Sequence, residues 1–281
     1  MFNKPYLIFI ILLLISLSCN KKPQKVEIQK IINIDDTSVL QKNKIYVKYK
    51  IPLPLDLFNF FLEDVEFDES FLLPTDITNL CSKHTHKALV LGIANADLAY
   101  CAITDHNQLS SLYFEISKNL AADLGINVGY TEELYKRFIE NINNKDSIQK
   151  IVDEAYWKTC NYLEENNKYN ILPFIIASGW YESVYLLIKS KNAEKYSQQV
   201  KDIILQQEDG FKRVQKFLYD AQMQTSASYY YDDIKKIILN IQKILDLYKG
   251  YYVKVNEKEK YYNSIISTIF EQKANFINGK F

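Results

Sequence analysis

The sequence predicts an all-α fold, a multi-helix bundle of about eight helices, because turn residues are scarce and apolar residues follow helical spacing. The 281 residues include seven glycines and six prolines. A sheet protein of this length needs many tight turns, and such turns demand glycine, asparagine or aspartate. Apolar residues recur instead three and four positions apart, as at Ile234, Ile237 and Ile241.

The N-terminus is typical of a bacterial export signal. Lys4 precedes an apolar run of about 12 residues, which is the length of a signal-peptide core. The triplet Leu17-Ser18-Cys19 ends the run and resembles the lipobox of bacterial lipoproteins, in which the cysteine is diacylated and becomes the new N-terminus. We therefore expect residues 1–18 to be a lipoprotein signal peptide and Cys19 to be the lipidation site. An uncleaved anchor is the alternative, but a membrane-spanning helix needs about 20 apolar residues.

Two further parts follow the signal peptide. Residues 19–44 are polar and carry Pro23, so we expect the lipidated N-terminus and a flexible tether there. Residues 45–281 form the expected helical domain, which begins with a short extended segment and has no linker that would divide it. We interpret it as one domain, with two packed helical layers as the alternative. A helical repeat is a further alternative, because the first and fifth long helices each carry a small-residue core.

Helix boundaries are expected at capping and stop signals. Asp105 caps the second long helix, Gly125 ends it, and Asp146 caps the fourth. Gly210 is a candidate break, and Gly250 ends a later helix. The expected helices span about residues 56–63, 76–103, 107–124, 146–166, 170–190, 193–224, 230–248 and 257–275, with a further one that begins after Thr131.

Charge and cysteine content argue against two classes of protein. Lysine and arginine together number 34, as do aspartate and glutamate, so no net charge steers the chain to nucleic acid. Only Arg137 and Arg213 offer the guanidinium fork that suits phosphates and bases, and we expect no nucleic-acid partner. Beyond the lipidated residue, Cys81, Cys101 and Cys160 are odd in number, which argues against a disulfide framework. We expect buried free thiols.

Two expected helices are apolar almost all round, which is typical of central buried helices. Each contains an acid: Asp97 in the first, and Glu182, the only charged residue between 171 and 188, in the fifth. The candidate buried polar site consists of Asp97, Glu182, Tyr100 and Trp180, and it would serve as a general acid–base pair or a ligand clamp with shifted pKa values. The alternative is that each acid accepts hydrogen bonds and fixes the packing, since a buried carboxylate without partners is costly.

Two glycines lie inside the same pair of helices. Glycine within a helix costs about 1 kcal/mol relative to alanine, so a buried helix keeps one mainly where a neighbouring backbone or bulky ring fills the space. We therefore expect Gly92 and Gly179 to mark close packing that matters to stability.

No catalytic or metal-binding motif stands out. The three histidines are His84, His86 and His106, and Cys81 with His84 offers too few close ligands where structural zinc wants four. The sequence lacks a Gly-x-Ser-x-Gly elbow, a His-Glu-x-x-His pair and a glycine-rich phosphate loop. We name no catalytic residue, and we expect no metal and no cofactor.

Three stretches carry a resemblance to a known family. Residues 91–100, residues 143–147 and residues 175–182 resemble a family of uncharacterised predicted lipoproteins from Bacteroidota. The resemblance implies an all-helical fold over most of the mature chain and supplies no catalytic residue. In that family, export to the cell surface is associated with acidic residues soon after the lipidated cysteine. This chain has Asn20-Lys21-Lys22-Pro23 there, which favours the outer membrane with the protein facing the periplasm.

These observations favour a lipid-anchored helical envelope protein that is a non-catalytic binding or interaction module. Its expected contacts are the membrane, through the N-terminal lipid, and an unknown envelope protein or small ligand. The alternative is an envelope hydrolase or transferase whose carboxylate site lies between the first and fifth long helices. That alternative requires Asp97 and Glu182 to face a common cavity that is open to water and lined by Tyr100, Trp157 or Trp180.

Overall fold

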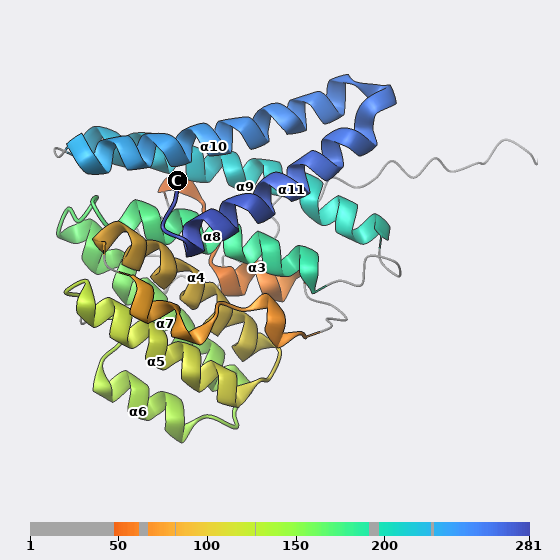
Figure 1. Cartoon of the computed structure of the whole chain (residues 1–281). Coiled ribbons are helices and arrows are strands. Elements are labelled where there is room, and N and C mark those ends of the chain that lie inside the picture. The colour runs from red at the N-terminus through yellow and green to blue at the C-terminus, as the bar shows by residue number, and fades with distance from the viewer. Residues whose placement is uncertain (1–47, 62–66, 82, 127, 191–196, 226–227) are drawn as a thin grey trace, which may run out of the picture. The chain divides into compact units, whose positions relative to one another are not determined.

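The structure is all-α, as the sequence predicts, and every regular element of the described residues is helical (Figure 1). The computed structural model describes residues 48–281 with gaps at 62–66, 82, 127, 191–196 and 226–227. Contacts group all of the described residues into one compact unit. The expected signal peptide, Cys19 and the expected tether lie outside the described residues.

The described residues form nine α-helices and three short 3-10 helices. The α-helices are α3 (Pro54–Phe61), α4 (His84–Ile103), α5 (Asn107–Asp123), α6 (Glu132–Glu140), α7 (Lys145–Glu165), α8 (Leu172–Lys189), α9 (Ser197–Gln224), α10 (Ser228–Val253) and α11 (Lys258–Ile277). The 3-10 helices are η3 (Glu69–Phe71), η4 (Thr75–Leu80) and η5 (Val255–Glu257).

Two central helices, α4 and α8, organise the fold. α4 contacts α3, α5, α7, α8 and α11, while α8 contacts α9 and α10 as well as α3, α7 and α11. Because neighbours surround both helices, neither needs a polar face. Residues 88–102 of α4 are accordingly all buried.

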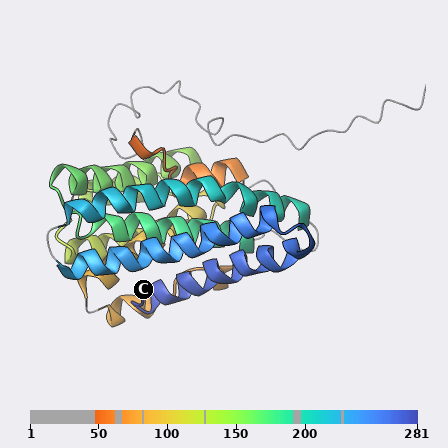
Figure 2. The ribbon, with the colours of Figure 1, turned by 90° about the horizontal axis from the view of Figure 1, so that it is seen from above.

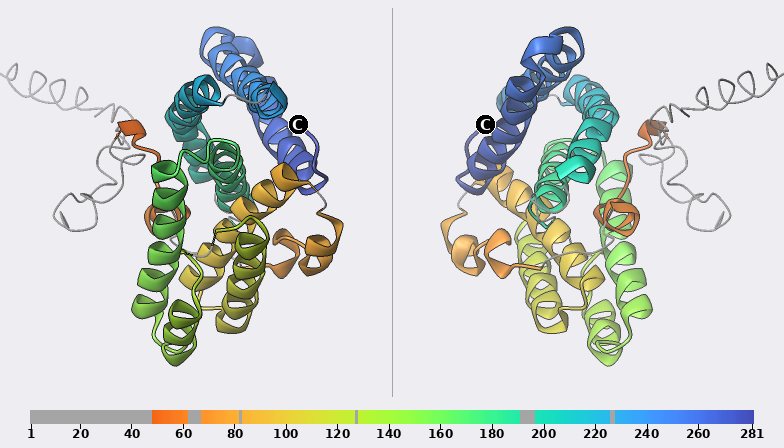
Figure 3. Two further views of the ribbon diagram at one scale, coloured as in Figure 1. Left: turned by 90° about the vertical axis from the view of Figure 1, so that its left-hand side faces the viewer. Right: turned by 90° about the vertical axis from the view of Figure 1, so that its right-hand side faces the viewer.

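The other helices form two groups on either side of the central pair. α5, α6 and α7 lie on one side, and α9, α10 and α11 lie on the other (Figures 1 and 3). α10 packs against both α9 and α11, so these three helices run side by side (Figure 2). α11 also contacts α8 and α4, so it lies against the central pair, where the candidate site lies.

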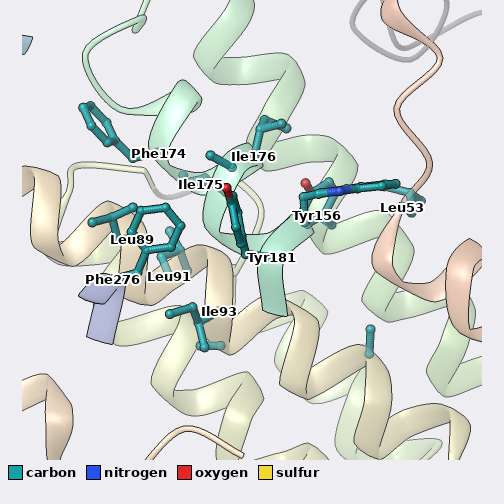
Figure 4. Close-up of a cluster of buried hydrophobic side chains, with 14 of the residues drawn as sticks. Leu53, Leu89, Leu91, Ile93, Tyr156, Phe174, Ile175, Ile176, Tyr181 and Phe276 are labelled. Atoms are coloured by element: carbon teal, nitrogen blue, oxygen red, sulfur yellow. The ribbon is translucent and has the colours of Figure 1, made fainter. Parts of the chain in front are cut away.

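Side chains of α4, α8 and α11 build the core between the central helices. Leu89 and Leu91 of α4 lie close to Phe174 and Tyr181 of α8, with Phe276 of α11 beside them (Figure 4). The Tyr181 and Phe276 rings meet edge to face with centroids 5.4 Å apart. Full burial of an apolar side chain of this size stabilises by about 1.5–3 kcal/mol, so these contacts hold α11 against α8.

α4 and α8 approach closely at two facing glycines, which confirms the prediction for Gly92 and Gly179. A Cβ atom on Gly92 would overlap Ser178 Oγ and the carbonyl oxygen of Ile175. A Cβ atom on Gly179 would lie 3.1 Å from the carbonyl oxygen of Gly92. The missing side chains thus let one backbone pack directly on the other.

The first long helix begins later than expected. The proline and capping residues at 74–76 start the 3-10 helix η4, and α4 begins at His84, after Lys83 takes an extended conformation. A start signal fixes where a helical turn begins but not how far the helix runs. The 3-10 helix η4 and the residue that follows it still pack against the domain, because Ile77 and Cys81 are both buried.

Two of the expected boundary signals act as predicted. Gly125 follows α5 in the left-handed region with a φ of 69°, which glycine adopts without strain. Thr131 caps α6, because its Oγ1 accepts the N–H of Leu134 at 3.1 Å.

Two expected caps are wrong by one or two residues. Asn144 caps α7 in place of Asp146, because its Oδ1 accepts the N–H of Ser147 at 3.0 Å. His106 precedes α5 in place of Asp105, whose φ of 64° departs from the extended conformation of a capping residue. Asn144 has the extended backbone of a capping residue, whereas the His106 side chain makes no capping hydrogen bond.

Gly210 and Gly250 neither break nor end a helix. α9 continues through Gly210, and α10 continues past Gly250 to Val253. In each case an aromatic ring of another helix fills the space of the missing Cβ atom: Trp180 packs on Gly210, and Tyr261 packs on Gly250. These glycines therefore serve packing and not chain reversal.

The described cysteines are buried and free, as expected. Burial raises the pKa of the Cys160 thiol to about 12, so this group stays a thiol at neutral pH. In the described part of the chain, no helix combines the length and the apolar character that crossing a membrane requires.

Candidate functional site

Three buried charged side chains meet between α4, α8 and α11. Asp97 of α4 and Glu182 of α8 are 0% exposed, and Lys273 of α11 is 6% exposed. Lys273 Nζ donates a hydrogen bond to Glu182 Oε1 at 2.9 Å. The structure thus brings together the two acids singled out from the sequence and adds a lysine that was not. We call Asp97, Glu182 and Lys273 the buried cluster.

The buried cluster holds the short backbone segment from Phe71 to Leu73, which we call the strap. Lys273 Nζ donates to the carbonyl oxygen of Phe71 at 2.7 Å. Asp97 Oδ2 accepts the N–H of Leu73 at 2.8 Å, and the Tyr113 hydroxyl of α5 donates to the carbonyl oxygen of Leu73 at 2.5 Å. Side chains of three helices therefore satisfy backbone groups that would be costly to bury without partners.

An aromatic face covers the ammonium group of Lys273. Its Nζ atom lies 3.6 Å from the centroid of the Tyr185 ring, which is within the range of a cation–π contact. The Glu182 carboxylate, the Phe71 carbonyl oxygen and this ring together replace the water that an exposed lysine would bind.

α11 places Lys273 on the side of the helix that faces the core. Buried residues recur along α11 at helical spacing, at Tyr262, Ile265, Ile269, Gln272, Lys273 and Phe276. A lysine in phase with a buried apolar stripe is the sequence signal that identifies this residue.

Burial raises the pKa of both carboxyl groups of the buried cluster. Burial and the neighbouring Glu182 charge raise the pKa of Asp97 well above its usual value. Burial also raises the pKa of Glu182, although the charge of Lys273 and a hydrogen bond with Asp97 lower it. A hydrogen bond between two carboxyl groups needs a proton, since ionised carboxylates only accept. The pKa of Asp97 is raised well above its usual value, so Asp97 is the carboxyl group of the pair in which the protonated form is favoured.

This protonation state makes the buried cluster electrically neutral. Burial lowers the pKa of Lys273, but the acidic groups around it, Glu182 first, outweigh burial and leave that pKa raised. One carboxylate and one ammonium group remain, and their charges cancel. Asp97 Oδ1 and Glu182 Oε2 are buried without a hydrogen-bond partner among the described residues.

The other two candidate residues have different surroundings. Tyr100 lies one turn along α4 from Asp97, is fully buried, and stacks on Phe67 with ring centroids 5.5 Å apart. Trp180 packs edge to face against Phe211 of α9 at 6.3 Å. Because Trp180 and Glu182 are two residues apart on α8, they point to different faces of the helix. The structure therefore keeps Tyr100 next to the buried cluster and separates Trp180 from it.

The buried cluster is closed to solvent. General acid–base catalysis requires a substrate or a water molecule within hydrogen-bond reach of the transferred proton. Here the Asp97 proton lies against Glu182, and the remaining polar atoms bond to Lys273 and to the strap. In this conformation the arrangement can fix α4, α8, α11 and the strap to one another, and it presents no acid to a bound molecule.

The histidines take part in local packing. His86 Nε2 lies 2.8 Å from the carbonyl oxygen of Ile277, and the His106 ring stacks on Phe67 at 3.4 Å. Within the described residues, no three or more histidine, cysteine, aspartate or glutamate side chains are grouped so that they could hold a metal ion.

Comparison of the chain with protein-family models, with curated proteins and with solved structures finds no match. Function is therefore inferred from the residues of this chain.

Proposed function

We propose that this chain is a lipid-anchored helical protein of the cell envelope that acts as a non-catalytic binding or interaction module. The observation that carries the non-catalytic part is the closed, neutral cluster of Asp97, Glu182 and Lys273. Its polar atoms bond to one another and to the strap. The two acids therefore stabilise the fold and do not serve a reaction.

The anchoring part of the proposal rests on the sequence. An apolar run that ends at Cys19 has the length of a signal peptide and is too short for a membrane span. The resemblance to predicted lipoproteins of Bacteroidota supports the same reading. The basic residues Lys21 and Lys22 support a position at the outer membrane, facing the periplasm.

The binding part is supported by large apolar side chains on the outer helices. Tyr219 and Met223 of α9 are 48% and 80% exposed, and Leu239 of α10 is 58% exposed. Tyr252 and Val253, at the end of α10, are 51% and 65% exposed. Tyr252 and Val253 are adjacent in the sequence, and grouped exposed apolar side chains mark surfaces that contact other molecules. The proposed partner is an envelope protein or a small ligand.

Metabolic labelling with a clickable palmitate tests the anchoring. The native chain should take up the label, and a Cys19→Ala chain should not. Cys101→Ala is the matched control, because that cysteine is buried and should leave labelling unchanged. Continued labelling of the Cys19→Ala chain would refute the proposed anchor.

Activity profiling against glycan and peptide substrates separates the interaction module from the alternative hydrolase or transferase. We expect no turnover by the native chain and recovery of a bound molecule from solubilised envelopes. The alternative enzyme would need the buried cluster to open and admit a substrate. Turnover that is present in the native chain and lost in an Asp97→Asn chain would overturn the non-catalytic proposal.

A further inference from the structure

The turn between α10 and α11 exposes apolar side chains close together. Tyr252, Val253 and Val255 are 51%, 65% and 69% exposed. Elsewhere among the described residues, large apolar side chains that are more than half exposed stand singly, as Met223 does on α9 and Leu239 does on α10. This turn is therefore the most concentrated exposed apolar group in the described part of the chain.

The tip, which we define as residues 249–260, has a backbone fixed by its own hydrogen bonds. The N–H of Lys254 donates to the carbonyl oxygen of Gly250 at 2.8 Å, and the N–H of Glu257 donates to that of Lys254 at 2.9 Å. The tip joins the ends of two adjacent helices and lies at the far end of the group formed by α9, α10 and α11 (Figures 1 and 2). Its apolar side chains are thus carried by an ordered turn at the end of this group of helices.

Lysines are interleaved with these apolar side chains. The tip contains Lys249, Lys254, Lys258 and Lys260, all of them exposed. Its two acids are each paired with a lysine: Glu257 with Lys260 at 3.2 Å, and Glu259 with Lys201 of α9 at 2.9 Å. Four lysines and two glutamates give the tip a formal charge of +2.

This combination of side chains suits the surface of an anionic bilayer. Tyrosine rings are favoured at the level of the lipid headgroups, where one end of the ring is apolar and the other is wet. Valine side chains can enter the same layer, while lysines beside them bind anionic phosphate groups and are attracted by the negative surface potential. A turn at the end of a helix pair can meet a planar surface without any change in the helices behind it.

We propose that the tip contacts an anionic lipid membrane through Tyr252, Val253 and Val255 and through its lysines. This inference rests on the proposed lipid anchor, which would hold the domain close to a bilayer. The 30 residues from Cys19 to Lys48 span at most about 100 Å when fully extended. Arg213 of α9 donates to the carbonyl oxygen of Lys50 at 2.9 Å. Lys201, which pairs with Glu259 of the tip, lies about 18 Å from Arg213 along α9. This distance is shorter than the reach of the extended tether, so the anchor allows the tip to reach the membrane.

The test uses the full chain with a Val253→Cys substitution and an environment-sensitive fluorophore. The described native cysteines are buried, so a thiol-reactive fluorophore should attach at position 253, and the native chain measures the background. The chain is added to vesicles of phosphatidylethanolamine and phosphatidylglycerol. Ile139→Cys is the matched control, because Ile139 is 41% exposed and lies on α6, on the other side of the central helices.

At position 253 we expect a blue shift in emission and quenching by nitroxide-labelled lipid, and at position 139 we expect neither. Lys249→Glu with Lys254→Glu should abolish the shift at 253, as should vesicles of phosphatidylcholine alone. An unchanged emission at 253 with every vesicle would overturn the proposal. A shift at 253 that appears only when solubilised envelope proteins are added would overturn it in favour of a protein partner.

The same experiment separates failure of the tip from failure of the anchor. A chain that takes up palmitate and stays with the vesicles, but shows no shift at 253, keeps the anchor and rejects the tip contact. A chain without palmitate that shows the shift at 253 when vesicles are added keeps the tip contact and rejects the anchor.

Discussion

Burial and the neighbouring Glu182 raise the pKa of Asp97 well above its usual value, so the protonated form, which can donate toward Glu182 from one oxygen, is favoured. Its other oxygen accepts the N–H of Leu73. An asparagine at position 97 has nearly the same shape and also offers one acceptor and one donor, but it cannot ionise. The Asp97→Asn variant is therefore a close mimic of the protonated native side chain.

We predict that the Asp97→Asn chain gains stability over the native protein as the pH rises. The folded-state pKa of Asp97 lies above its unfolded value of about 3.9. Its contribution to stability is complete below that unfolded value and is lost as the pH rises toward the folded value, because the unfolded chain has released a proton that the folded protein still binds. The native free energy of unfolding should fall by up to about 1.4 kcal/mol per pH unit in this window relative to the variant.

Urea unfolding at a series of pH values from mildly acidic to mildly alkaline measures this difference. The gap should widen with pH in favour of the Asp97→Asn chain. A gap that stays constant across the series would show that Asp97 is ionised in the folded protein.

Gly92 and Gly179 give a second prediction at the scale of single residues. Gly92→Ala should destabilise more than Gly179→Ala, because the new Cβ atom at position 92 overlaps the backbone oxygen of Ile175. At position 179 the nearest atom is the carbonyl oxygen of Gly92 at 3.1 Å, and a small shift accommodates it. Gly179→Leu should overpack the same contact and cost about 1–3 kcal/mol. Thermal melts decide, and a Gly179→Leu chain that melts at or above the native temperature would contradict the close packing of α4 on α8.

At the scale of elements, α11 is held to the central helices by two kinds of contact. Phe276 packs on Tyr181 in the apolar core, and Lys273 bonds to Glu182 and to the strap. The strap depends on α11 in turn, because Lys273 donates the hydrogen bond to its Phe71 carbonyl oxygen. The two segments should therefore loosen together.

We predict that Lys273→Met increases hydrogen exchange in both α11 and the strap. The substitution removes the donor to Phe71 and leaves Glu182 as a buried carboxylate without its counter-ion, which costs about 3–5 kcal/mol. Exchange measured by mass spectrometry should rise in peptides that cover 69–73 and 258–277. Lys258→Met is the matched control on the same helix, since Lys258 is exposed, and it should leave both peptides unchanged. Faster exchange confined to α11 would argue that the strap is held independently.

Much of the helical arrangement could be predicted from the sequence, because a buried helix face places apolar residues three and four positions apart. The all-round apolar character of α4 and α8 identified the central pair, and glycines inside them identified the contact between Gly92 and Gly179. Helix ends were less predictable. Gly210 and Gly250 have the sequence signature of a break, yet a ring from another helix fills the space beside each. That information belongs to the tertiary contact and not to the local sequence.

The candidate site was predicted in part. Asp97 and Glu182 are isolated acids on apolar helices, and that signal correctly marked both as buried. The strap leaves no such signal, since the cluster binds its backbone atoms, which every residue carries. Lys273 stands among many lysines and becomes notable only when its phase on α11 is compared with that of Ile269 and Phe276. Trp180 shares α8 with Glu182, but helix geometry sends it to another face.

At the scale of the whole molecule, contacts between distant parts of the sequence tie the described chain together. Lys273 bonds to Phe71 across 202 positions, and the Tyr49 hydroxyl bonds to Asp220 across 171 positions. These contacts fasten the first described segments to the last helices. We therefore expect the domain to unfold as one cooperative unit.

The interior and the surface of the molecule have different roles. The buried cluster accounts for the unusual chemistry of the interior, since its three charged side chains are buried and bond to one another or to the strap. The proposed contacts with other molecules fall instead on the outer helices and on the tip, far along the chain from the central pair. Substitutions in the cluster should thus change stability, and substitutions in the tip should change membrane contact.

The most direct test of the stabilising role of the buried cluster is a double-mutant cycle on Lys273 and Glu182, in which the free energy of unfolding is measured. Lys273→Met and Glu182→Gln should each destabilise strongly, because each leaves one buried charge uncompensated. The double variant leaves neither charge, so its loss should be smaller than the sum of the two single losses by about 1–3 kcal/mol. Losses that add to within about 0.5 kcal/mol would contradict the account, since they would mean that the two side chains do not stabilise each other in the folded protein.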